Sequence, residues 1–354
     1  MNIPYGFLLF LTLVVSQIYG QNDAKFRDEK LIDFAKLSNT YTQSPSVLYS
    51  ELPTLSPTSM DDSFKSYAPT SSEFSNNFNI KLIKYGDSDE KYDVYVEKAK
   101  ARWESIIIGD LYDIPAISEK TNPGGWFGYY LPDEKAEYCS VDDIIIAYNF
   151  KHIDGIGKKL GYTAITAIRE YEKGSFPISS IITLDLKDIE ILVQEKTFGN
   201  VILHEMGHAL GFSSTMWVNY ESGCGISCEL YNERVHEGCK ASQIFNELGF
   251  EGDLKLYSDG VLNDGKYCSH WDENQLGDEL MTPYISIDGY APLSAITIGA
   301  FQDMGYEVSY ESADDISLIQ SASNHIENSS IATHMLKNRE NEGFDLISPF
   351  VIKI

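Results

Sequence analysis

The sequence predicts an α+β fold, because three β-like runs come first and a helix follows them, with no helical pattern between the runs. The runs are rich in β-branched residues and are separated by Gly or Pro. The helix, expected over 197–210, has apolar residues at the spacing of a buried face and a glycine directly after it, as a C-terminal cap. The expected strands cover 143–150, 161–169 and 178–186. The apolar helix residues are Phe198, Ile202, Met206 and Ala209.

Further helical patterns flank this central part. Residues 91–108 form a helical pattern with Val94, Ala101, Ile106 and neighbouring residues on one side. Two shorter helical patterns lie farther along the chain, around 240–250 and 293–304.

The 354 residues divide into five expected parts. The first 20 residues carry no charge and contain the apolar run FLLFLTLVV, which predicts a secretory signal; an uncleaved membrane anchor is the alternative. The next part is rich in Ser, Thr and Pro, cannot build a core, and is read as a spacer or a propeptide-like arm. The parts are a signal peptide (1–20), this arm (21–79), an N-terminal subdomain (80–211), a C-terminal subdomain with a cysteine-rich insert (212–311) and a polar tail (312–354).

The charge balance argues against two classes of partner. Lys and Arg number 27 against 53 Asp and Glu, a formal charge of -26. Such a field repels phosphate backbones and anionic lipid surfaces, so we expect no nucleic-acid partner and no stable membrane insertion once the signal is removed. A calcium-loaded acidic protein is an alternative, but the sequence lacks a D-x-D-x-D-G loop. A solvated acidic surface is the favoured interpretation.

The cysteines are typical of an oxidising compartment. Four of the five fall within 45 residues, which predicts two disulfides of unread connectivity and one cysteine left over. A structural zinc cluster is the competing interpretation. The cysteines are Cys139, Cys224, Cys228, Cys239 and Cys268.

The most specific motif is H-E-x-x-H, which lies inside the predicted 197–210 helix. His204 and His208 are four residues apart and therefore lie one turn above each other, so both imidazoles can bind one zinc ion. Glu205 then stands beside the remaining coordination position, where a general base belongs. Two exposed helix histidines are the bland alternative. One catalytic Zn²⁺ is the expected cofactor.

A catalytic zinc needs a third protein ligand and an open position. Gly211 fits the continuation x-x-G-x-x-H, but Ser214 stands at its histidine, so the ligand must lie farther on. His270 is favoured over His236, because it precedes Trp271 directly and Met281 by 11 residues, whereas His236 lies in a polar stretch.

Several segments resemble the leishmanolysin family of metzincin zinc peptidases, most specifically HEMGHALGF (204–212), SHWDENQLGDELMTP (269–283) and LSAITIGAFQDMGYEV (293–308). Segments 101–111 and 141–170 are also similar to it, so the resemblance extends over residues 80–310. The resemblance implies a twisted mixed sheet with the zinc helix and a smaller C-terminal subdomain carrying a Met-turn at Met281, with a cleft between them. It implies His270 as third ligand, and an edge strand, expected within 178–186, that pairs with an extended peptide. The propeptide cysteine usual in that family is absent, because no cysteine precedes Cys139. The family's long cysteine-rich C-terminal domain is also not expected here.

The expected function is that of a secreted zinc metalloendopeptidase acting on protein or peptide substrates. Glu205 would be the general base toward a zinc-bound water. Tyr284 or Tyr290 is a candidate oxyanion donor, although an ordinary structural tyrosine is the simpler interpretation of each. A catalytically silent zinc-fold binding or adhesion protein is the alternative function. The expected location is extracellular, which includes the cell surface or a lysosome-like compartment, and oligomeric state cannot be read.

Overall fold

The computed structural model of the chain describes residues 77–86, 89–117, 125–130, 139–171, 174–217, 226–229, 232–235, 237–258, 267–284, 289–316 and 350–353. The expected signal peptide, nearly all of the 21–79 arm and most of the 312–354 tail lie outside these residues. His236 lies outside them as well.

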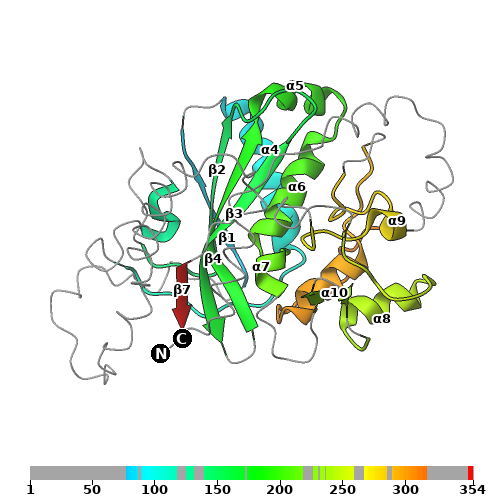
Figure 1. Cartoon of the computed structure of the whole chain (residues 1–354). Coiled ribbons are helices and arrows are strands. Elements are labelled where there is room, and N and C mark those ends of the chain that lie inside the picture. Colours follow the sequence, from blue (N-terminus) through cyan, green and yellow to red (C-terminus); the bar gives the residue numbers. More distant parts are fainter. Residues whose placement is uncertain are drawn as a thin grey trace, which may run out of the picture. The chain divides into compact units, whose positions relative to one another are not determined.

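A five-stranded mixed sheet forms the centre of the described part (Figure 1). The strand order is β1-β2-β4-β3-β7; β1, β2 and β4 run parallel, β3 is antiparallel to β4, and β7 is parallel to β3. The three predicted strands correspond to β2, β3 and β4, and the predicted α+β class is confirmed. The strands are β1 (Ile80–Lys84), β2 (Ile144–Lys151), β3 (Gly161–Tyr171), β4 (Gly174–Asp185) and β7 (Phe350–Lys353).

The expected edge strand is wrong, because β4 is an interior strand. Ser180, for example, pairs with Ile146 on one side and with Ile165 on the other. The long β3–β4 hairpin places β3 outside β4, and β7 then pairs with only four residues of β3, Ala167 to Glu170. Within the described residues, the first half of β3, residues 161–166, is therefore an open edge of the sheet, and β1 is the edge on the opposite side.

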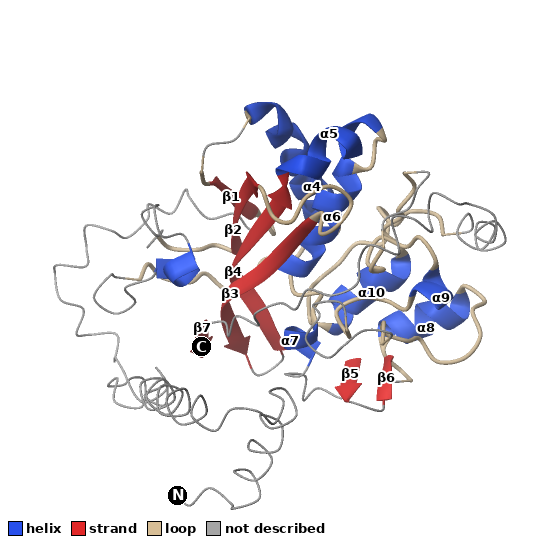
Figure 2. Ribbon diagram, turned by 45° about the horizontal axis from the view of Figure 1, so that its top comes forward, coloured by secondary structure: helices blue, strands red, loops and turns tan. Residues whose placement is uncertain are grey.

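Three helices pack on one face of the sheet (Figure 2). They are α4 (Asp93–Glu104), α5 (Leu186–Gln194) and α6 (Phe198–Ala209), and a short 3-10 helix, η2 (Glu90–Tyr92), leads into α4. The helices predicted over 91–108 and 197–210 thus exist, and α6 buries the apolar residues expected of it.

The side of the 91–108 helix that carries Val94 and Ala101 is not its buried side. Val94 is 50% exposed and Ala101 is exposed, whereas Val96, Ala99 and Trp103 are buried. The indole of Trp103 decides the orientation, because its Nε1–H donates to the carbonyl of Leu203 on α6 at 3.0 Å. Ile106 is buried as expected, but it lies beyond the end of the helix.

The opposite face of the sheet is covered by irregular chain. A 3-10 helix, η3 (Gly125–Tyr130), buries Trp126 and Phe127 against sheet residues such as Ile145 and Ile181. Because both faces are covered, β2 is buried along its length except at Lys151. This explains its continuous apolar run, which is typical of strands that are covered on both sides.

Residues after α6 form a second group of small elements. Helix α8 packs on α10, and the Asp303 carboxylate accepts hydrogen bonds from the backbone N–H groups of Lys240 and Ala241 at the start of α8. The helical patterns expected around 240–250 and 293–304 are confirmed by α8 and α10. The elements are α7 (Ser214–Trp217), β5 (Ile226–Glu229), β6 (Asn232–Val235), α8 (Lys240–Glu247), α9 (Glu273–Leu276) and α10 (Ala295–Asp303).

Candidate active site

Helix α6 carries the H-E-x-x-H motif on a rigid support. Phe198, Ile202 and Met206 are fully buried beneath it, and Gly211 follows its end at φ +116°. A side chain at that φ would be strained, so glycine suits the turn that ends the helix. The support fixes His204 and His208 one turn apart with both rings on one side.

Three imidazole nitrogens converge beside this helix. The Nε2 atom of His208 lies 2.9 Å from Nε2 of His204 and 3.1 Å from Nε2 of His270. The Nε2 atoms of His204 and His270 are 3.2 Å apart. The structure therefore brings the three predicted histidines together, although His270 follows His208 by 62 residues in the chain.

The hydrogen bonds of Nδ1 in His204 and His208 determine the protonation state of Nε2 in the same rings. Nδ1 of His204 lies 2.6 Å from the carbonyl oxygen of Leu280, and Nδ1 of His208 lies 2.5 Å from that of Phe212. A carbonyl oxygen only accepts, so each Nδ1 holds the proton and each Nε2 presents a lone pair to the common point. Burial, with the neighbouring His204, lowers the pKa of His208 to about 3. His208 is therefore neutral at physiological pH, the form that binds metal.

His270 is held by the backbone of its neighbours. The N–H of Tyr257 donates to the carbonyl of His270 at 2.9 Å, and the N–H of Trp271 donates to the carbonyl of Met281 at 3.0 Å. The indole of Trp271 is fully buried and donates to Thr297 Oγ1 at 2.8 Å. These contacts hold the imidazole of His270, which is 7% exposed, opposite α6.

The carboxyl group of Glu205 is buried, and its pKa lies near neutral pH. Its side chain is 7% exposed, and its Oε2 lies 2.7 Å from the hydroxyl of Thr163 on β3. Burial raises the pKa of Glu205 to about 7, although the Thr163 hydroxyl and the charge of Lys159 oppose the rise. The role of Thr163 could not be predicted from the sequence, because nothing in the local pattern shows which strand residue will face a helix residue 42 positions away.

Met281 packs directly against the zinc-motif helix. A Cβ atom placed on Gly207 would lie 2.8 Å from Met281 Sδ and 3.0 Å from Trp103 Cζ2. The glycine between Glu205 and His208 thus permits the fully buried Met281 to contact the helix between the two histidines. The need for glycine at position 207 could not be predicted either, because a glycine inside a helical pattern indicates only a locally less stable helix.

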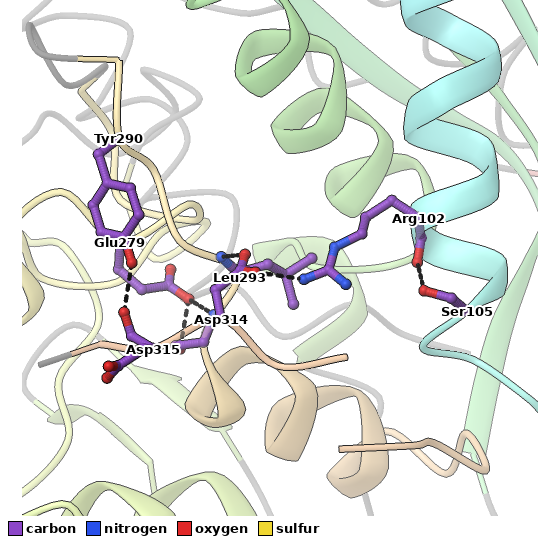
Figure 3. A network of polar contacts seen from close by, with 8 residues as sticks. Arg102, Ser105, Glu279, Tyr290, Leu293, Asp314 and Asp315 are labelled. Carbon is purple, nitrogen blue, oxygen red and sulfur yellow. Dashed lines mark hydrogen bonds and ion pairs between the residues drawn. The ribbon is translucent and has the colours of Figure 1, made fainter. Parts of the chain in front are cut away.

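The two tyrosines considered as oxyanion donors have other partners. The Tyr290 hydroxyl donates to the carbonyl of Asp315 at 2.5 Å (Figure 3). The hydroxyls of Tyr284 and Tyr257 lie 3.0 Å apart. These contacts agree with the simpler interpretation of both residues as structural.

Comparison with known proteins identifies the family. A family model described as leishmanolysin matches residues 152–334, which include all three histidines and Glu205. The chain belongs to the leishmanolysin family. A ciliated left-right organizer metallopeptidase of Xenopus laevis is 29% identical over 121 residues, which cover 30% of this chain and 16% of that protein. The leishmanolysin family consists of zinc-dependent metallopeptidases, so the chain is related to zinc proteases.

The histidine group of this leishmanolysin-family chain fits a zinc ion. Zinc binds imidazole at roughly 2.0–2.1 Å in tetrahedral geometry, which puts ligand nitrogens about 3.3 Å apart. The Nε2 separations of 2.9, 3.1 and 3.2 Å are close to this spacing. Lone pairs that face each other at such distances repel, and a shared cation removes the repulsion.

A second group of possible metal ligands in the leishmanolysin-family chain consists of three aspartates, and a buried arginine offsets their negative charge. Oxygen atoms of Asp110, Asp142 and Asp143 lie within 4.8 Å of one another. The fully buried Arg169 contributes a positive charge there and donates to the carbonyls of Asp142 and Asp143. This group therefore gives no support to the calcium alternative.

No helix in the ranges that the structure describes is long and apolar enough to cross a membrane.

Proposed function

We propose that the chain is a zinc-dependent endopeptidase in which one zinc ion is held by His204, His208 and His270. The observation that carries the proposal is the meeting of three histidine Nε2 atoms, two of them presenting lone pairs, beside a buried carboxyl group. A zinc ion in this site would lower the pKa of water and polarise a scissile carbonyl.

Glu205 is proposed as the general base and acid. It takes a proton from the attacking water and gives it to the departing amine nitrogen. A pKa of about 7 suits both steps, because such a carboxyl accepts and releases a proton near neutral pH. Thr163 holds one carboxyl oxygen by its hydroxyl and so fixes where the proton is received.

The peptide substrate is proposed to pair with the open half of β3, in place of the edge expected on β4. Thr163 lies in this half and contacts Glu205, so a peptide added along residues 161–166 would pass the carboxyl group. Main-chain hydrogen bonds to a sheet edge bind extended peptides with little dependence on sequence.

The finer metzincin arrangement is also part of the proposal. We assign the zinc helix to an N-terminal subdomain (80–211) and the Met-turn at Met281 to a smaller C-terminal subdomain (212–311). The packing of Met281 against Gly207 supports this assignment.

Cleavage of a denatured protein by the purified chain tests the function. We expect cleavage within the substrate chain, loss of activity on chelation, and recovery with zinc. Full zinc occupancy without any cleavage would instead favour the silent binding or adhesion alternative. The small share of the Xenopus relative that is matched makes this direct test necessary, because its activity cannot be transferred whole.

Export is proposed from the uncharged apolar leader at residues 1–20. Cys268 is disulfide-bonded, which suits an oxidising compartment. An exported protein that still begins at Met1 would contradict cleavage of the leader.

Gly161→Ala is expected to lower activity while leaving zinc in place. A Cβ atom there would lie 3.0 Å from Glu205 Oε1 and 3.1 Å from the carbonyl oxygen of Thr183. Because the backbone cannot yield easily, the carboxyl group must shift, and a misplaced base lowers kcat by roughly 10- to 100-fold. Steady-state kinetics with zinc analysis provides the measurement.

Gly199→Ala is the matched control for this change. Gly199 lies in the first turn of α6, and its nearest described neighbour would be Tyr95 Cδ1 at 3.9 Å. Alanine therefore fits and favours the helix by about 1 kcal/mol. Equal kcat in the Gly161→Ala variant and the parent would refute the positioning of Glu205 by this strand.

A further inference from the structure

Glu279 is a buried carboxylate with four hydrogen-bond donors around it. It is 1% exposed. Its Oε1 accepts from Ser294 N at 3.1 Å, Ser294 Oγ at 2.7 Å and Thr297 Oγ1 at 2.5 Å. Its Oε2 accepts from the backbone N–H of Met281 at 2.6 Å. A buried carboxylate is costly unless such donors surround it, so the site is built for one.

The hydrogen-bond donors around Glu279 offset part of the cost of burying a carboxylate. Ser294 is the N-cap of α10, so Glu279 lies at the positive end of that helix dipole. Burial raises the pKa of Glu279, and the four donors oppose the rise. All four contacts need an accepting oxygen, which a carboxylate supplies at both of its atoms.

Two of these contacts lead directly to the histidines. Glu279 fixes the N–H of Met281, and the carbonyl of the residue between them, Leu280, accepts the Nδ1 proton of His204 at 2.6 Å. Thr297, the donor on the other oxygen, accepts the indole N–H of Trp271, which is the neighbour of His270. One carboxylate thus joins the supports of two imidazoles that come from distant parts of the chain.

We propose that Glu279 is a positioning residue for the zinc site, holding the Leu280 carbonyl, Met281 and Trp271 in the places that orient His204 and His270. The inference rests on the proposed zinc peptidase function. Glu279 contacts neither the substrate nor the metal in this assignment. It acts through the carbonyl group and the indole that it holds.

The same network continues outward to α4 (Figure 3). Asp314 accepts from the N–H of Leu293 at 2.9 Å, directly before Ser294, and from the guanidinium of Arg102 at 2.8 Å. The Arg102 and Asp314 side chains are 27% and 42% exposed, so solvent screens this ion pair and it adds little to stability. The buried Glu279, and not the outer ion pair, should dominate the network.

Glu279→Gln in the full chain is the sharpest test, because it keeps the shape of the side chain. An amide has one accepting oxygen, so its NH₂ group must face a donor, either Met281 N–H or the Ser294–Thr297 pair. Loss of such an outer contact weakens metal binding by roughly 10- to 100-fold. We expect this loss in zinc affinity, measured by chelator competition, and a changed visible spectrum of the Co²⁺-loaded protein.

Asp303→Asn is the matched control for a merely structural role. Asp303 also holds two backbone N–H groups, those of Lys240 and Ala241 at the start of α8, and it lies at the other end of α10. We expect it to lower the melting temperature of the metal-free protein while zinc affinity and the Co²⁺ spectrum stay at parental values. An equal loss of zinc affinity in the Asp303→Asn and Glu279→Gln variants would overturn the inference.

Thr297→Val keeps the test decisive if Glu279→Gln does not fold. It leaves the carboxylate intact and removes the hydroxyl that links Glu279 to Trp271, while the contacts of Glu279 with Ser294 and Met281 remain, so zinc affinity should fall by a smaller factor. Parental zinc affinity in the variants that fold would reject the positioning role alone. A parent chain that binds no zinc would reject the proposed function, and the inference with it.

Discussion

Glu205→Ala is expected to lower peptide hydrolysis by roughly 10²- to 10⁴-fold, the range that a positioned general acid–base group contributes. Zinc should stay bound, because the three converging nitrogens belong to His204, His208 and His270. The fall should appear in kcat more than in KM, since the carboxyl group acts on a proton in transit. Kinetics on a peptide substrate and zinc content of the same sample are the two measurements.

Glu205→Gln separates proton transfer from shape. Glutamine can keep an oxygen within reach of the Thr163 hydroxyl, which lies 2.7 Å from the native carboxyl oxygen, but it cannot accept a proton at neutral pH. We expect it to be about as inactive as the alanine variant. Glu190→Gln is the control, because Glu190 is an exposed glutamate on the neighbouring helix α5. Parental activity in both Glu205 variants would remove Glu205 from the mechanism.

The zinc helix could be predicted from sequence because its information is local. Apolar spacing, the terminal glycine and the two histidines all lie within 14 residues of α6 and its cap, and each acts over one or two turns. The short helices α8 and α10 were predictable for the same reason.

The edge strand could not be predicted, because position in a sheet is decided by pairing between distant residues. The runs that became β3 and β4 have similar β-branched composition, and only the hairpin between them and the pairing of β4 with β2 put β4 inside. The buried face of α4 could not be predicted for the same reason. Trp103 sets it through a contact with Leu203, 100 residues away.

The positioning residues form a further class that sequence patterns do not show. Thr163 acts through its contact with Glu205 on another element, and Glu279 acts through its contacts with Met281 and Thr297; neither residue belongs to a motif. Glu279 even reads as an ordinary surface charge in the acidic stretch before Met281, although it is almost fully buried.

His270→Ala should abolish stoichiometric zinc binding. Its Nε2 lies 3.1 Å and 3.2 Å from those of His208 and His204, so removal of the ring leaves only two nitrogen ligands on one helix. The loss should exceed the roughly 10- to 100-fold weakening that changes outside the ligand set cause. Zinc content after dialysis against a weak chelator measures it.

His236→Ala is the matched control, because it removes the competing downstream histidine from a stretch rich in charge. We expect parental zinc content and activity in this variant. The native fold of His270→Ala should be checked by circular dichroism, since Trp271 next to it is fully buried. Stoichiometric zinc in a folded His270→Ala, with loss in His236→Ala, would assign the third ligand to His236. Three separate contacts of the His270 segment, from Tyr257 to His270, from Trp271 to Met281 and from Trp271 to Thr297, argue for the first outcome.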